Sequence, residues 1–128
     1  MRLRSLLILT FATLSLFGQE VFAVKEGENR FAYYVQDETD PGLYYKSGVK
    51  TAQTALRPTP LIKIAFDQGI EPEALLTPYD LRLIKTFASY SLYEASSPQK
   101  SVAIASRIWE TTGIRYAVPL FERKKELK

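Results

Sequence analysis

The chain has 128 residues, with 17 basic and 14 acidic side chains and a formal net charge of +3, and it contains neither cysteine nor histidine. Without these two residue types it has no disulfides, no catalytic thiol, no histidine general base and none of the usual zinc or haem ligands. The charge is too small to indicate nucleic-acid binding. We therefore expect no metal, no cofactor and no nucleic-acid partner.

Residues 1–23 have the three-part layout of a secretory signal peptide. A basic head with Arg2 and Arg4 precedes an apolar run from Ser5 to Phe17, and Val21-Phe22-Ala23 ends in a small residue. This layout predicts cleavage after Ala23. The alternative is an uncleaved anchor, but the apolar run is shorter than the ~20 residues that a spanning helix needs.

The predicted cleavage places the mature chain outside the cytoplasm, in the periplasm or secreted. No later segment is apolar and long enough to span a membrane, and a chain without cysteine cannot carry a lipid on a cysteine. Small secreted eukaryotic domains usually rely on disulfides. A cysteine-free exported domain therefore favours a bacterial envelope or bacterial secretion.

The predicted mature part has about 105 residues and, after the loss of two arginines and one glutamate, a net charge of +2. This is the size of one domain. We expect a polar leader and possible β-hairpin over residues 24–46, a helical core over 47–118 and a charged tail over 119–128. Its first part is acidic and its last part basic.

The first elements after the leader form a predicted β-hairpin. Phe31 to Val35 is rich in β-prone residues, and residues 36–42 contain the turn signal Pro41-Gly42. Leu43 to Tyr45 is then the return strand. From Ser47 to Leu56 the apolar spacing indicates a helix, which Pro58 ends.

Three pairs of a hydroxyl residue and proline, Thr59-Pro60, Thr77-Pro78 and Ser97-Pro98, match the N-cap and first position of a helix. The first predicts a short helix ending at Gly69, although residues 61–66 also alternate as a strand would. Pro72 to Leu76 is a possible further helical turn.

The second of these pairs predicts a helix from Thr77 to Ala95, apolar over more than half of its circumference and therefore central to the core. The third predicts a helix from Ser97 to Thr112, ended by Gly113. Residues 114–118 are again β-prone, and Pro119 is expected to end that strand. The sequence thus predicts a mainly α single small domain of three to four helices with a minor β element, in which the first and last strands pair.

Three patterns suggest catalytic or metal chemistry but have simpler explanations. Ser97-Pro-Gln-Lys100 and Ser47-Gly-Val-Lys50 match the Ser-x-x-Lys spacing of serine β-lactamases, yet the companion motifs of those enzymes are missing and Ser97 is a helix cap. The acidic segment 37–42 lacks the ligand spacing of a calcium loop. A glycosidase needs a carboxylate pair, for which the candidates are Glu71, Glu73, Asp80, Glu94 and Glu110. No catalytic residue is assigned.

The adjacent tyrosines Tyr33-Tyr34 and Tyr44-Tyr45 are the candidate binding residues. In extended structure the two rings of each pair point to opposite faces, so that one ring can enter the core while the other stays exposed. Exposed tyrosines are typical of recognition surfaces. The alternative is half-buried packing with the tyrosine hydroxyl groups in water.

These observations favour a non-enzymatic exported protein that binds another protein, within a cell-envelope assembly. The alternatives are a small carboxylate-dependent hydrolase acting on cell-wall sugar or peptide, and a carrier of a small apolar ligand. Arg123, Lys124 and Lys125 are fewer than a lipid-binding cluster usually has, so we expect at most weak membrane-surface contact from them.

Overall fold

The computed structural model describes residues 21–46 and 55–122, and this part of the chain is mainly β. Two four-stranded antiparallel sheets contain all of its strands. The first has the order β1 (Val21–Gly27), β2 (Arg30–Gln36), β3 (Tyr44–Lys46), β4 (Ala55–Leu56). The second has the order β6 (Arg82–Thr86), β7 (Ser91–Glu94), β5 (Pro58–Phe66), β8 (Ile114–Phe121). The described residues form two helices, α2 (Pro72–Leu76) and α3 (Pro98–Ile108), so the prediction of a mainly α domain with a helical core is wrong.

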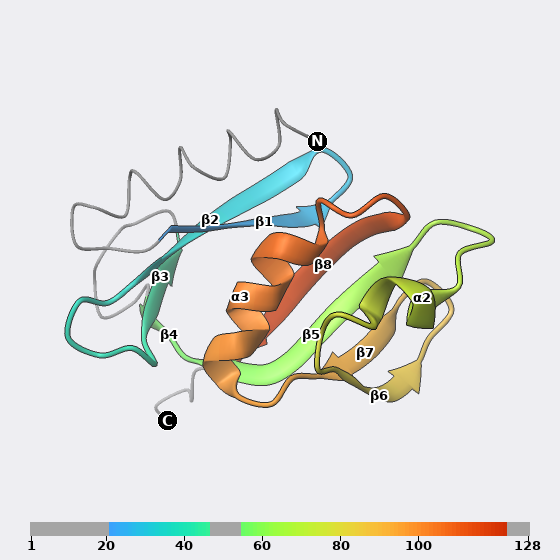
Figure 1. Ribbon diagram of the computed structural model, residues 1–128. Helices are drawn as coiled ribbons and strands as arrows, with labels where there is room; N and C mark the ends of the chain where they lie inside the picture. Colours follow the sequence, from blue (N-terminus) through green and yellow to red (C-terminus); the bar gives the residue numbers. More distant parts are fainter. Residues whose placement is uncertain (1–20, 47–54, 123–128) are drawn as a thin grey trace, which may run out of the picture.

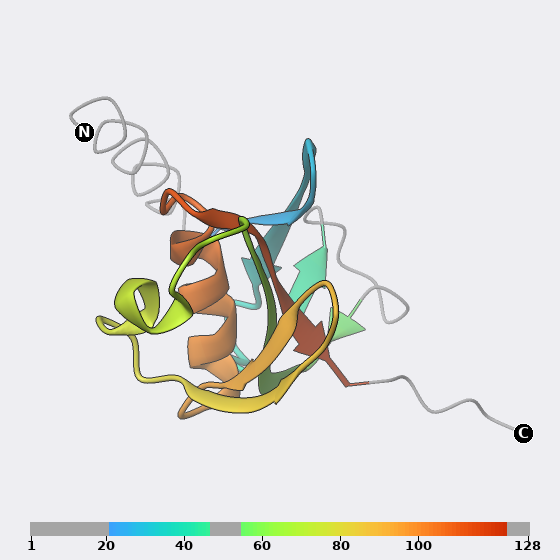
Figure 2. The same ribbon diagram turned by 90° about the vertical axis from the view of Figure 1, so that its right-hand side faces the viewer.

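Helix α3 joins the two sheets into one structure (Figure 1). It packs against β5 and β8 of the second sheet and against β1 of the first, and β1 also lies beside β8. Figure 2 shows α3 covering one face of the second sheet, with the hairpin of β6 and β7 at the outer side of that sheet. The edge strands β1 and β8 therefore meet near the helix.

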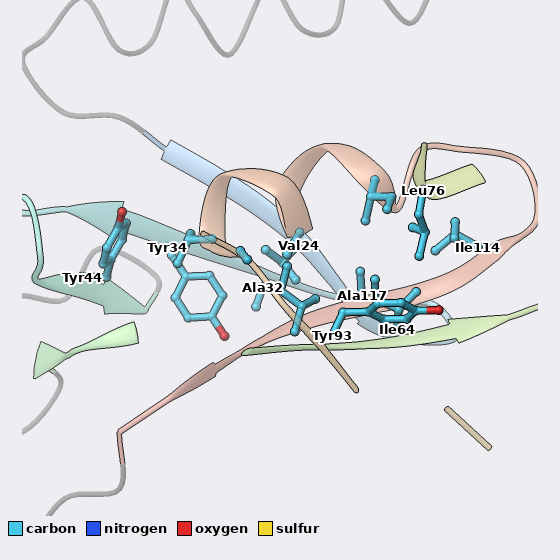
Figure 3. Packing of buried hydrophobic residues seen from close by; sticks show 14 residues of the cluster. Val24, Ala32, Tyr34, Tyr44, Ile64, Leu76, Tyr93, Ile114 and Ala117 are labelled. Atoms are coloured by element: carbon cyan, nitrogen blue, oxygen red, sulfur yellow. The ribbon is translucent and has the colours of Figure 1, made fainter. Parts of the chain in front are cut away.

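A single hydrophobic cluster draws on both sheets and on α3 (Figure 3). Val24, Ile62, Ile64, Val102 and Ile108 are fully buried within it. Helix α3 contributes its apolar face as predicted, since its buried positions recur every three or four residues. This common core holds the first sheet in a fixed place relative to the second.

The predicted central helix from Thr77 to Ala95 does not form. Thr77 instead ends α2, where its hydroxyl donates to the Glu73 carbonyl at 2.7 Å, and residues 82–94 form the β6–β7 hairpin. A helix that is apolar over more than half of its circumference needs a core around most of it, whereas on β7 the residues alternate between buried and half-buried. The strand period accounts for the side chains of β7, whereas all five residues of β6 are exposed.

The predicted helix after Thr59 is likewise strand β5, which is the alternative that its alternation allowed. The Thr59 hydroxyl donates to the Leu120 carbonyl at 2.9 Å, so it links β5 to β8 and does not cap a helix. Pro119 lies inside β8, where it opposes Ile62 beside an irregularity of the ladder. An edge strand tolerates proline because one of its sides needs no backbone donor, and the expected end of the strand at Pro119 is wrong.

The polar leader expected before residue 31 is largely strand β1, which pairs with β2 and includes Val21 to Ala23. The expected pairing of the first and last predicted strands is also wrong, because β2 pairs with β1 and β3 while β8 pairs with β5. Of the helix predicted over 47–56, residues 47–54 lie outside the described residues and Ala55–Leu56 is strand β4.

The β2–β3 hairpin, the helical turn α2 and the Ser97 start of α3 are confirmed. The Ser97 side chain accepts a hydrogen bond from the Lys100 backbone N–H at 3.2 Å, and Pro98 occupies the first turn. Helix α3 ends at Ile108, a few residues earlier than predicted, and Gly113 follows in a turn with φ of +104°.

Candidate functional site

The two tyrosine pairs are divided by the pleat of the first sheet. Tyr34 and Tyr44 are buried, with exposed fractions of 3% and 1%, whereas Tyr33 is 47% exposed and Tyr45 is half-buried. Directly paired residues of antiparallel strands share a face, and Tyr45 is paired with Val35. Val35 lies two positions after Tyr33 on β2, so Tyr33 and Tyr45 are on the same face of the sheet. One ring of each pair therefore enters the core and the other lies on the outer face.

Tyr34 is a structural residue on the inner face. Its hydroxyl donates to Glu26 Oε2 at 2.9 Å, and the same oxygen lies 3.2 Å from Lys46 Nζ. Its ring packs against Phe121 at a centroid distance of 5.0 Å, which connects the two sheets. Burial, with the hydrogen bond to Glu26, raises the pKa of Tyr34 above its ordinary value, so folding disfavours loss of its hydroxyl proton.

Tyr44 is also structural, and Figure 3 shows it with Tyr34 among the buried side chains. Its ring meets Phe22 edge-on at a centroid distance of 5.8 Å, and its hydroxyl accepts from Gln36 Nε2 at 3.4 Å. The sequence-predicted set of four binding tyrosines therefore reduces to Tyr33 and Tyr45.

The outer face of the first sheet has a further exposed aromatic residue that the sequence analysis did not select. Phe31 is 49% exposed and lies two positions before Tyr33 on β2, so both rings are on the same face. Lys25 pairs with Phe31 across β1 and β2, and its ammonium lies 6.0 Å from the ring centroid. We call Lys25, Phe31, Tyr33 and Tyr45 the aromatic face.

Trp109 fixes one end of the aromatic face. Its ring meets Phe31 edge-on at a centroid distance of 5.3 Å, and its Nε1 donates to the Ala23 carbonyl at 2.8 Å. The Trp109 side chain is half-buried and packs at the boundary of the core. The alternation of β2 could have revealed Phe31 from the sequence, but no local signal places Trp109 beside it.

At the other end, Tyr45 lies near the acidic turn between β2 and β3. Partial burial, with the negative charge of Asp37, raises the pKa of Tyr45. Asp37 Oδ2 itself accepts from the backbone N–H groups of Thr39 and Asp40, each at 3.0 Å, and from the Thr39 hydroxyl at 2.9 Å. These bonds hold the pKa of Asp37 below its usual value.

The same contacts explain the acidic segment without calcium. Asp40 accepts from the Gly42 N–H at 3.0 Å and from Arg57 at 2.9 Å, so its carboxylate, like that of Asp37, stabilises the turn. In the described part of the chain, no three carboxylates come together in a way that would hold a metal ion.

The remaining candidates that lie within residues 21–46 and 55–122 do not assemble into a catalytic group. The Ser97 side chain caps α3, and Ser47, Lys50 and the basic tail from Arg123 lie outside the described residues. Among the carboxylates considered for glycoside cleavage, Glu71, Glu73 and Asp80 are exposed, Glu110 is half-buried, and Glu94 forms an ion pair with Arg82.

Comparison with known family models, with curated proteins and with solved structures finds no match to this chain. Neither described helix is long and apolar enough to cross a membrane.

Proposed function

We propose that the protein is an exported, non-enzymatic binding protein whose aromatic face contacts another protein, within a cell-envelope assembly. The observation that carries the proposal is the pair Phe31 and Tyr33, two large rings that are each about half exposed side by side on one face of a sheet. The amino-terminal signal layout supports export.

The aromatic face has the composition of a protein-binding surface. Aromatic residues are enriched where proteins meet, because they offer a large contact area with few rotatable bonds. Contacts with Trp109 and Lys25 hold the Phe31 ring, and ordering it in a complex would therefore cost little conformational entropy. The opposite face of the sheet is in the core, so the face is presented on a rigid support.

A partner of this kind is expected to present an apolar patch of its own. Burying the two half-exposed aromatic side chains would stabilise the complex by a free energy of ~25 cal/mol for each Å² of apolar surface removed from water. Such rings in the centre of an interface commonly contribute about 2 kcal/mol or more to binding.

Affinity capture from an envelope extract, with matched variants as bait, tests the proposal. Phe31→Ser and Tyr33→Ser alter the aromatic face at exposed positions, whereas Leu83→Ser alters an exposed residue of similar size on the β6–β7 hairpin. We expect the unchanged chain and Leu83→Ser to capture similar amounts of one partner protein. The aromatic-face variants should capture at least about tenfold less of it. Equal retention by all of the baits would contradict the proposal.

A further inference from the structure

A second apolar surface lies on the β6–β7 hairpin. All five residues of β6 are exposed, and β6 is an edge strand of the second sheet. Leu83, Ile84 and Phe87 are 52%, 42% and 38% exposed, and together with Phe31 and Tyr33 they make up the large exposed hydrophobic residues of the described chain. Three of these five side chains thus fall within five consecutive positions.

Cations surround this apolar surface. Lys85 Nζ lies 5.1 Å from the centroid of the Phe87 ring, and Lys63 Nζ lies 4.7 Å from that of Tyr90. The two rings stack on one another with centroids 4.8 Å apart. Residues 81–93 contain no Asp or Glu, and Arg82 pairs with Glu94 at the far end of the hairpin. Lys63 and Lys85 are both paired with Leu92 and lie on the same face of the sheet as Phe87, whereas Leu83 is paired with Tyr93 and lies on the other face. Because β6 is an edge strand, the exposed apolar side chains of both faces meet at the free edge of the hairpin, beside the two lysines.

The backbone of β6 is poorly suited to pairing with another strand. The register shifts between Leu83 and Lys85, so Ile84 interrupts the ladder as a bulge. Bulges and lysines are the features by which edge strands avoid the addition of a further strand. Contact through the side chains remains, and adjacent apolar and cationic side chains match the layer where acyl chains meet anionic headgroups.

We propose that the free edge of the β6–β7 hairpin, residues 82–94, binds the surface of an anionic lipid bilayer, with Leu83, Ile84 and Phe87 entering the headgroup layer and Lys63 and Lys85 facing its phosphates. Figure 1 places this hairpin on the opposite side of the molecule from β1 and β2, which carry most of the aromatic face. Contact with a bilayer would therefore leave the aromatic face accessible to a protein.

Vesicle co-sedimentation tests the proposal, with the purified exported protein and vesicles of equal parts phosphatidylglycerol and phosphatidylcholine, or of phosphatidylcholine alone. We expect binding to the mixed vesicles that weakens with added salt. Phe87→Ser and Leu83→Ser should each weaken it about tenfold, and Lys85→Gln about fivefold. Lys100→Gln is the matched control for Lys85→Gln, because it removes an exposed lysine outside both surfaces. The variants all have the same residues 1–23, so a retained leader would add the same amount of vesicle binding to each of them.

A spectroscopic measurement complements the sedimentation. The chain has one tryptophan, and in the variant Leu83→Trp the second indole should shift its emission to shorter wavelength on mixed vesicles, beyond any change in the unchanged protein. Equal sedimentation of hairpin and control variants, or no binding to mixed vesicles, would overturn the proposal. Retention by immobilised polyglutamate without binding to vesicles would also overturn it and would indicate an acidic protein partner.

Discussion

Gly113 should be one of the least replaceable residues of the fold. It is buried in the turn between α3 and β8, has φ of +104°, and its carbonyl accepts the Asp67 N–H at 2.9 Å. A residue with a Cβ in left-handed backbone costs about 1–2 kcal/mol. In Gly113→Ala the new Cβ would also lie 3.0 Å from Leu75 Cδ1 and 3.2 Å from Ile70 Cδ1.

Both of those contacts are with the ends of flexible side chains, which can move away by leaving their preferred rotamers at roughly 0.5–1.5 kcal/mol. We therefore expect Gly113→Ala to lower the free energy of unfolding by about 2–3 kcal/mol. For a domain of this size that loss corresponds to a decrease in Tm of roughly 10–20 °C.

Gly69→Ala is the matched control. Gly69 has φ of +78°, but a Cβ there would meet nothing within 4 Å, so the variant should lose only the backbone contribution, about 1–2 kcal/mol. The effect of alanine on the unfolded chain is common to both variants and cancels in the comparison. Urea unfolding measures both free energies. A Gly113→Ala variant as stable as Gly69→Ala would show that the packing around the turn is not as described.

Three further predictions concern single side chains. Ser97→Ala should lower the free energy of unfolding by about 1 kcal/mol through loss of the α3 cap, while Ser96→Ala should not; equal losses in urea unfolding would refute the cap. Because the folded pKa of Tyr34 is raised, stability should fall as the pH rises above about 10, and alkaline urea unfolding should show a shallower fall for Tyr34→Phe. Arg115 lowers the pKa of Glu28, so the stability that this pair contributes is present above the ordinary glutamate pKa and is lost as the pH falls through the lowered value. The Tm of Glu28→Gln should therefore fall less in acid than that of the unchanged protein. The same dependence of Tm on pH in both proteins would contradict the pairing.

Local patterns predicted the elements whose signals were themselves local. The turn at Pro41-Gly42, the cap at Ser97 and the division of the tyrosine pairs each depend on neighbouring residues, and the structure confirms all three. The strand period alone was enough to place one ring of each tyrosine pair in the core.

The error over residues 77–95 has a physical origin. A threonine followed by proline satisfies a helix start, but the same dipeptide suits a turn or the first residues of an edge strand. The choice depends on partners far along the chain, because β7 is stabilised by pairing with β5. The pairing of β5 with β7 cannot be read from the local pattern of one sequence.

The same limit applies to the candidate site. Tyr33 was found through its pattern, and Phe31 was within reach of the same argument. The contact between Phe31 and Trp109 joins the second strand to the end of α3, and only the three-dimensional structure shows it. Similarly, Glu28 of the acidic first part forms an ion pair with Arg115 of the basic last part, at 2.8 Å.

Strand β1 has a consequence for the proposed export of the chain. Val21, Phe22 and Ala23 pair with β2, and Ala23 provides the carbonyl that Trp109 binds. If the leader is removed after Ala23, the peptidase must act while this segment is an open, extended chain, since in the folded protein the scissile bond lies within a paired strand. Folding and processing would then compete in time: a chain that folds early keeps its leader, and a processed chain begins in mid-strand and completes its first sheet from Val24 onward.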